Sequence, residues 1–256
     1  MARGRNFYEE SKAQGRLWTP TELRGTGELY GWFDPGDVST ISVSTGISTW
    51  RDKSGFGRNA TQGTAANQPA YSFSGFPGAK AAISPDGSND SFSWSGPAYN
   101  STDGFCLFAT LVAPSGSGNF NLCSGITGGP NFDIDTNKQR VVRSFQALIV
   151  GSSTTLSNTT YILGWEAANN YVATWTNGVV NTSTSTNPAF TSGSTTFFND
   201  QGGGFYANVV RQMVFTKLLP TRRRQQLEGF LAWESELQSR LTVNHPYRNR
   251  PPLIGT

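Results

Sequence analysis

Two acidic side chains at alternate positions are the residues in this 256-residue sequence that come nearest to a catalytic pattern. Asp133 and Asp135 flank Ile134, and in a strand this spacing puts both carboxylates on one face. Glycan hydrolysis needs two such carboxylates flanking one bond. No glutamate follows, because Lys138 stands where the third acid of a glycanase strand would be. We therefore expect aspartates on a solvated strand face rather than a catalytic pair.

Other catalytic groups are scarce. His245 is the only histidine and lies in a proline-rich segment, which argues against a Ser-His-Asp triad or a histidine base. Glu166 is expected at a strand end. Cys106 and Cys123 lie in strand-like segments without a metal-binding spacing, and we expect reduced thiols in the core. The sequence thus predicts that the protein is not an enzyme.

A calcium site and a sugar site are the two binding functions that the loops suggest. Asp86, Asn89 and Asp90 offer oxygen ligands at short spacing, although an ordinary Asp- and Asn-rich turn accounts for the same residues. We expect no cofactor other than this calcium ion.

Aromatic platforms near strand ends are the candidates for carbohydrate binding. Trp94, Tyr99 and Trp175 are the aromatic residues of this set, and Asn177 would supply a polar contact. Trp175 stands just before the Asn177-Gly178 hairpin signal and is the best candidate for an exposed ring. The alternative is that these rings belong to the core.

The composition indicates an all-β protein. Charged residues make up 14 % of the chain, against about 25 % in typical domains, and aromatic residues 12 %. The net charge is +3, which does not indicate a nucleic-acid partner. No apolar run approaches the ~20 residues of a membrane span, so membrane insertion is not expected. The first residues lack the apolar core of a secretory signal.

Short apolar runs at nearly regular spacing predict the strands of a sandwich. Residues 104–112 are apolar on both faces and are expected to form a central strand. One helix is expected over residues 221–241, with Thr221 as its N-cap and an apolar stripe that includes Leu227, Phe230 and Leu231.

Three segments follow from this pattern. Residues 1–27 are expected to form a basic N-terminal arm, residues 28–242 the sandwich with its helix, and residues 243–256 an extended, proline-rich tail. Both arms combine cations with aromatic residues, which suggests contacts with other subunits. The expected assembly contacts are Arg3, Arg5, Phe7, Tyr8, Arg16, Trp18, Arg222, Arg223, Arg224, His245 and Tyr247.

Three ordered motifs carry a family resemblance. They are residues 32–35 (WFDP), residues 50–55 (WRDKSG) with 58–60 and 69–71, and residues 227–233 (LEGFLAW) followed by 245–247 (HPY) and 251–252. Together they resemble the concanavalin A-like, laminin-G-like jelly-roll domains of bacteriophage virion proteins. Phe230 and Glu234 depart from the pattern, in which tyrosine and a basic residue are usual.

The resemblance implies a two-sheet jelly-roll sandwich with one C-terminal helix packed on it and extended terminal arms. It also implies a virion structural protein, as a capsid decoration, head fibre or tail component, assembled in the host cytoplasm. Its partners would be other virion proteins, further copies of the chain, or a host glycan. A carbohydrate-binding adhesin module is the alternative, and a glycan hydrolase is the distant one.

Overall fold

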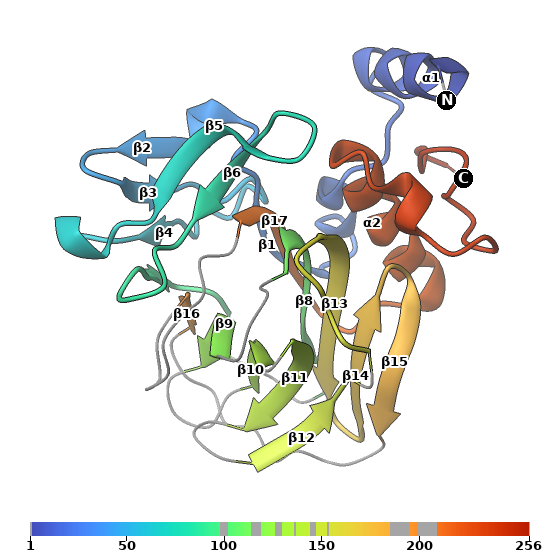
Figure 1. The fold of residues 1–256 in the computed structure, drawn as a ribbon. Coiled ribbons are helices and arrows are strands. Elements are labelled where there is room, and N and C mark those ends of the chain that lie inside the picture. Colours follow the sequence, from blue (N-terminus) through green and yellow to red (C-terminus); the bar gives the residue numbers. More distant parts are fainter. Residues whose placement is uncertain are drawn as a thin grey trace.

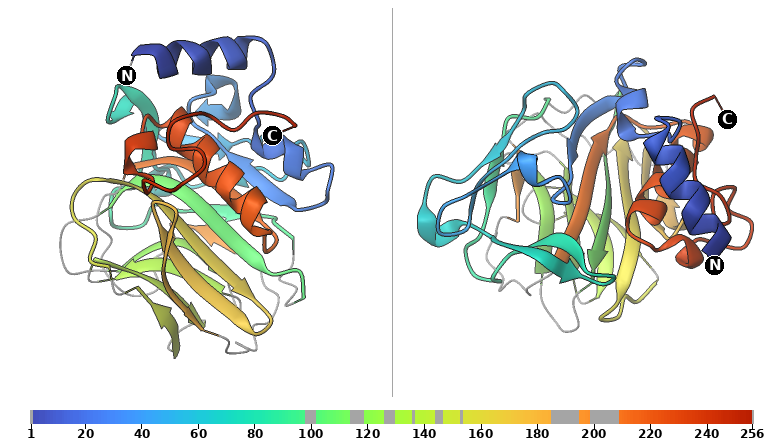
Figure 2. Two further views of the ribbon diagram at one scale, coloured as in Figure 1. Left: turned by 90° about the vertical axis from the view of Figure 1, so that its right-hand side faces the viewer. Right: turned by 90° about the horizontal axis from the view of Figure 1, so that it is seen from above.

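The computed structural model describes residues 2–97, 102–113, 119–125, 130–135, 137–143, 147–152, 154–184, 195–198 and 209–255. Two antiparallel sheets stack as a sandwich, and both chain ends lie beside one C-terminal helix (Figures 1 and 2). The prediction of an all-β, two-sheet sandwich with a C-terminal helix is confirmed.

The first sheet has the order β15-β14-β13-β8-β17-β6-β5, and β1 also pairs with β17. Its strands are β1 (Leu29–Phe33), β5 (Ala70–Phe76), β6 (Lys80–Ser84), β8 (Phe105–Val112), β13 (Thr160–Ala168), β14 (Tyr171–Thr176), β15 (Val179–Thr184) and β17 (Val209–Thr216).

The second sheet has the order β12-β11-β10-β9-β16-β7-β4-β3-β2. Its strands are β2 (Ile41–Val43), β3 (Ile47–Trp50), β4 (Ala60–Thr61), β7 (Phe92–Trp94), β9 (Asn119–Gly125), β10 (Pro130–Asp135), β11 (Lys138–Arg143), β12 (Ala147–Gly151) and β16 (Thr195–Phe197). The short helical elements are η1 (Pro20–Leu23), η2 (Val38–Thr40), η3 (Ala65–Asn67) and η4 (Gln238–Arg240).

Strand β8 explains why the first sheet is buried on both faces. Leu107 and Ala109 belong to the core between the sheets, whereas Cys106 and Phe108 belong to a second core under the C-terminal helix. Side chains alternate between faces along a strand, so an uninterrupted apolar run supplies both layers. The prediction that residues 104–112 form a central strand is confirmed.

The C-terminal helix α2 (Thr221–Glu234) covers the outer face of the first sheet (Figure 2). It is shorter than the expected 221–241, because Glu236 adopts a left-handed φ of 58° just after the helix ends. Pro220, not Thr221, is the N-cap, and no side chain caps this end. The later leucines of the predicted stripe remain buried, although they lie beyond the helix.

The N-terminal arm differs most from the expectation. Residues Ala2–Ala13 form a helix, α1, rather than an extended arm. Tyr8 stacks on Trp233 of α2 with ring centroids 5.6 Å apart, so α1 lies over α2. Among the described side chains of α1, Tyr8 and Ser11 are buried, and the sequence of the helix has no regular apolar stripe, which is why periodicity failed to reveal it.

The two ends of the chain pair with each other. Leu17 and Leu253 form an isolated antiparallel bridge, and the Trp18 amide donates to the Pro252 carbonyl at 3.0 Å. The tail was expected to be extended, but it consists largely of turns, since the amides of His245 and Arg248 donate to carbonyls three residues earlier, and both termini pack on the body of the same chain. No helix in the described part of the chain is long and apolar enough to cross a membrane.

Candidate functional site

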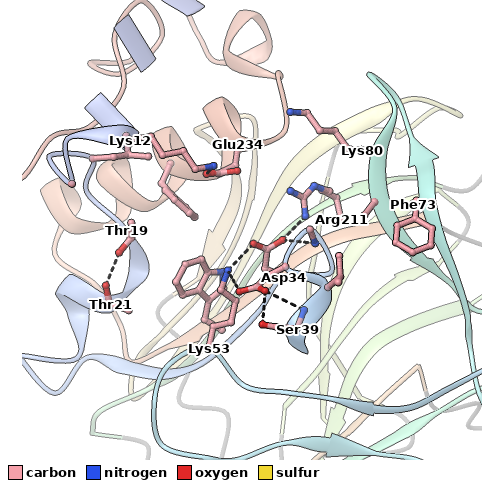
Figure 3. A pocket seen from close by; sticks show the side chains of 18 of the residues that line it. Lys12, Thr19, Thr21, Asp34, Ser39, Lys53, Phe73, Lys80, Arg211 and Glu234 are labelled. Carbon is pink, nitrogen blue, oxygen red and sulfur yellow. Dashed lines mark hydrogen bonds and ion pairs between the residues drawn. The ribbon is translucent and has the colours of Figure 1, made fainter. Parts of the chain in front are cut away.

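A hollow of about 1030 Å³, here called the polar groove, lies between the two terminal segments and the strands β1, β5, β6 and β17 (Figure 3). Its lining residues include Lys12, Glu22, Trp32, Asp34, Asp37, Val38, Ser39, Lys53, Tyr71, Phe73, Lys80, Arg211 and Glu234.

A buried ion pair forms one wall of the polar groove. The Arg211 guanidinium contacts the Asp34 carboxylate, and Lys53 Nζ lies 3.1 Å from Asp34 and 3.3 Å from Asp37. Burial alone would raise the pKa of Asp34, but Arg211 and Lys53 outweigh burial and hold this pKa below its usual range. Gly36 permits the close packing, since a Cβ there would lie 2.6 Å from an Arg211 nitrogen. This wall is therefore fixed and charged.

The WRDKSG loop brings Lys53 to the groove. Asp52 accepts hydrogen bonds from the backbone amides of Trp32 at 3.0 Å and Ser54 at 2.8 Å. The Lys53 amide in turn donates to the Trp32 carbonyl at 2.7 Å, and the Asn59 side chain accepts from the Asp52 amide at 3.1 Å. The motif thus ties the loop to β1 and holds Lys53 beside the ion pair.

Two N–H groups of groove-lining residues have no acceptor within the described part of the chain. They are Arg211 Nε and Trp32 Nε1, in side chains whose residues are 4 % and 7 % exposed. Buried polar groups usually have a partner, and leaving one unpaired costs about 1–3 kcal/mol. Both groups belong to residues that line the groove, although the two nitrogen atoms themselves are buried.

Aromatic and aliphatic surface lies beside these charges. Lys53 Nζ lies 4.5 Å from the centre of the Trp32 ring. Tyr71 and Phe73 pack edge to face with centroids 4.9 Å apart, and Phe73 is 71 % exposed. The groove therefore combines charged groups with apolar rings that a ligand can reach.

Of the predicted sugar-binding residues, Trp94 and Asn177 serve the fold. Trp94 is 2 % exposed and donates from its indole to the Arg58 carbonyl at 2.8 Å. Asn177 adopts a left-handed φ of 52° in the predicted hairpin and accepts from the Ile162 amide at 3.0 Å. Tyr99 lies outside the described residues. The ring of Trp94 has no exposed face for a sugar.

Trp175 lies within a polar network under α2 rather than on an open surface. Its ring is covered by the Arg224 guanidinium at 3.5 Å, and its indole donates to Glu166 at 2.7 Å. Arg224 approaches Glu228 at 3.4 Å, and Glu228 contacts His245 Nε2 at 3.1 Å. Burial raises the pKa of Glu166 to about 7, against the opposing effects of the Trp175 bond and Arg224. This network attaches α2 and the HPY segment to the sheet.

The predicted calcium ligands form a hydrogen-bonded turn. Asp86 accepts from the amides of Ser88 at 2.8 Å and Asn89 at 3.4 Å, and Asp90 accepts from the Asp86 amide at 2.7 Å. No cluster of three His, Cys, Asp or Glu side chains suited to a metal occurs among the described residues. Calcium binding remains a prediction.

The alternating aspartates share one face, as expected, and both contact Arg140. Asp133 is buried rather than solvated, and burial raises its pKa to about 6 although Arg140 opposes the change. Asp133 and Asp135 are not a free pair, since one guanidinium contacts both, and neither lines the polar groove.

The predicted assembly residues separate into buried and exposed groups. Tyr8, Trp18, Arg224, His245 and Tyr247 are buried within this chain. The HPY segment packs on α2, because the Trp233 indole donates to the Tyr247 carbonyl at 2.8 Å and a Cβ on Gly229 would lie 2.5 Å from Tyr247 Cβ. These contacts account for the motif as a structural unit.

The exposed group is small. Arg16 and Arg222 face solvent, and Arg223 is partly buried with its Nε 4.0 Å from Glu28. The side chains of Arg3, Arg5 and Phe7 lie outside the described residues.

Sequence reasoning did not identify the polar groove. Its clearest signal is Arg211, a charged residue within the apolar strand β17, since a buried cation requires a partner. Asp34 and Lys53 lie within the WFDP and WRDKSG motifs, which indicate the fold rather than a binding site.

No protein-family model matches the chain, and no curated protein matches it in sequence. Its structure is similar to Trypanosoma rangeli sialidase, with a TM-score of 0.57 and 13 % identity over 80 % of this chain and 33 % of that chain. It is also similar to the binding domain of botulinum neurotoxin DC in complex with SialylT, with a TM-score of 0.56 and 11 % identity over 80 % of this chain and 51 % of that chain. A botulinum neurotoxin type C structure, whose cell entry depends on two ganglioside molecules, gives a TM-score of 0.55 and 10 % identity over 75 % and 50 % of the two chains.

The comparison corrects one prediction. We expected a protein that is not an enzyme, and this is contradicted by the similarity to a sialidase, so an enzymatic role has to be tested. The chain spans about a third of the sialidase and half of the toxin chains, and at these identities the likeness concerns the fold. The chain thus has the fold of a concanavalin A-like β-sandwich.

Proposed function

We propose that this protein binds a carbohydrate in the polar groove. The observation that carries the proposal is the pair of unpartnered donors, Arg211 Nε and Trp32 Nε1, in two residues that line one hollow. A sugar hydroxyl or carboxylate would supply the missing acceptor. The new hydrogen bonds would offset the cost of removing water from the sugar.

The balance of charges in the groove fits a polyhydroxylated ligand. Four basic side chains (Lys12, Lys53, Lys80 and Arg211) and four acidic ones (Glu22, Asp34, Asp37 and Glu234) line it. A hydroxyl group both donates and accepts, so it can bond to either kind. Tyr71 and Phe73 offer ring surface for the apolar faces of sugar rings.

The similar structures support the choice of ligand class. They include a sialidase, a toxin domain in complex with SialylT and a toxin that depends on gangliosides for cell entry. Sialylated glycans therefore belong first in the panel to be screened.

The test is a glycan array followed by titration calorimetry on the glycans that bind. Lys53→Met removes the charge beside Asp34 and keeps an unbranched stem over Trp32, and we expect at least about tenfold weaker binding. Lys217→Met is the matched control, because Lys217 also pairs with an aspartate, Asp103 at 3.2 Å, and does not line the groove. Equal affinity of the two variants, or an array without binding, would refute the proposal.

An enzymatic role can be tested with the same glycans. NMR spectra of each glycan, recorded over time in the presence of the protein, would show whether it is cleaved. Cleavage would extend the proposal from binding to hydrolysis, and Asp34, Asp37 and Glu234 would then be the first acids to replace. Glycans that bind and stay intact would restrict the function to recognition.

We also propose that the chain is a structural component of a bacteriophage virion, located in the particle and attached to other virion proteins or to copies of itself. The order of the WFDP, WRDKSG, LEGFLAW and HPY motifs supports this. Because the described aromatic residues of both arms are buried, the docking surface would consist of exposed residues, Arg16 and Arg222.

Charge reversal tests the docking surface without unfolding the arms. We expect Arg16→Glu with Arg222→Glu to lower incorporation into particles, and Lys138→Glu, at an exposed site in the β10–β11 hairpin, to leave it unchanged. Normal incorporation of the double variant would contradict docking through this surface.

A further inference from the structure

A second hollow adjoins the polar groove and has the opposite chemistry. It measures about 500 Å³ and is lined by uncharged residues, among them Val38, Ile41, Val43, Tyr71 and Phe73. We call it the apolar hollow. Val38, Tyr71 and Phe73 line both hollows, so the two are continuous.

The apolar hollow lies between the edges of the two sheets. Strand β2 is the last strand of the second sheet and β5 the last of the first. Three side chains here are strongly exposed: Phe73 at 71 %, Val43 at 58 % and Val38 at 57 %. Such a cluster of apolar groups in water is typical of an interaction site.

The orientation of the rings is set by the fold. The Tyr71 hydroxyl donates to the Pro35 carbonyl at 2.9 Å, which holds this ring between the two hollows. Phe73 packs edge to face on Tyr71 and thereby remains directed outward, at the boundary between charged and apolar surface. The two rings thus form the boundary between the two hollows.

We propose that the ligand of the polar groove is a glycolipid in a membrane. Its sugar head group would occupy the polar groove, and the apolar hollow would contact the lipid that carries it. This inference rests on the proposed carbohydrate binding. It follows from the continuity of the hollows, because a free oligosaccharide in the polar groove would leave Ile41 and Val43, which line only the apolar hollow, in water.

Co-sedimentation with vesicles tests this inference. The probes are phosphatidylcholine vesicles that carry mixed gangliosides, plain phosphatidylcholine vesicles, and the free ganglioside oligosaccharides. We expect the ganglioside vesicles to bind at least about tenfold more tightly than the free oligosaccharides, since burying exposed apolar side chains adds affinity. Plain vesicles should bind weakly.

The Val43→Asp variant distinguishes the contribution of the apolar hollow from that of the polar groove, because Val43 lines the apolar hollow and not the polar groove. We expect it to weaken binding to ganglioside vesicles about tenfold and to leave binding of the free oligosaccharides unchanged. Val243→Asp is the matched control, at a valine that is 77 % exposed elsewhere on the surface.

The outcomes distinguish this inference from the proposed function. Binding of free oligosaccharides with no gain on vesicles, or with no effect of Val43→Asp, would overturn the glycolipid and keep the carbohydrate. A dimer that Val43→Asp dissociates, seen by light scattering, would assign the hollow to a second copy and also overturn it. Failure to bind either vesicles or oligosaccharides would overturn both proposals.

Discussion

Replacing Glu166 by glutamine should make the protein more stable at alkaline pH. Glu166 is 1 % exposed and accepts from the Trp175 indole at 2.7 Å. Burial raises its pKa from an ordinary 4.5 to about 7, in spite of Arg224 nearby. Glutamine keeps an oxygen acceptor for Trp175 and never ionises, so the substitution removes only the titration.

The sign and the size follow from proton linkage. The folded state holds the proton of Glu166 more tightly than the unfolded state, so the stability that this group contributes is complete below about pH 4.5 and is lost as the pH rises to about 7. Each tenfold difference in proton affinity corresponds to 1.36 kcal/mol, which gives a loss of about 3 kcal/mol. We expect the stability difference between Glu166→Gln and wild type to grow by this amount between about pH 4 and pH 8.

Urea unfolding of both proteins across this pH range measures the difference directly. Other shifted groups, such as Asp133, titrate in both proteins and cancel. Glu10→Gln, at an exposed glutamate of α1, is the matched control. A difference that does not change with pH, or a variant that is less stable at alkaline pH, would refute the reasoning.

Three further substitutions or treatments test the packing of the fold. Gly229→Ala should lower the free energy of unfolding by about 1–2 kcal/mol, because overpacking against the Tyr247 Cβ exceeds the gain of about 1 kcal/mol in helix propensity, and in a Tyr247→Gly background, which lacks that Cβ, the same substitution should instead stabilise the protein. Cys106 and Cys123 are both buried and unbonded, and burial raises the pKa of each thiol, so a maleimide should label neither until the protein is denatured. Tyr8→Ala should cost about 2–4 kcal/mol in urea unfolding, since its ring is buried against α2; a variant as stable as wild type would show that α1 does not stabilise the fold.

The parts of the fold that local patterns encode could be read from the sequence. The apolar run of β8 predicted a central strand, and Asn177-Gly178 predicted the hairpin between β14 and β15, where both residues have positive φ. These signals are strong because a single strand or turn determines them. Helix α1 was missed because its stability depends on Tyr8 meeting Trp233, a contact that no local pattern records.

The polar groove could not be predicted for the same reason. Asp34 follows β1, Lys53 lies in the WRDKSG loop and Arg211 belongs to β17, and only the antiparallel pairing of β1 with β17 brings them together. Conversely, Trp175 looked exposed because it precedes a hairpin, while Arg224 of α2 in fact covers its ring. Aromatic residues near strand ends are thus poor guides to a binding face unless the packing of α2 is known.

Resonances of the two unpartnered N–H groups provide the most direct test of the carbohydrate site. A two-dimensional ¹⁵N–¹H spectrum resolves the indole N–H of each tryptophan and the Nε–H of arginine. On addition of a glycan that binds on the array, we predict shifts for Trp32 Nε1–H and Arg211 Nε–H, whereas Trp94 and Trp175, whose indoles already donate within the fold, should stay unchanged. Shifts at Trp175 with none at Trp32 or Arg211 would contradict the account and place the sugar beside the β14–β15 hairpin.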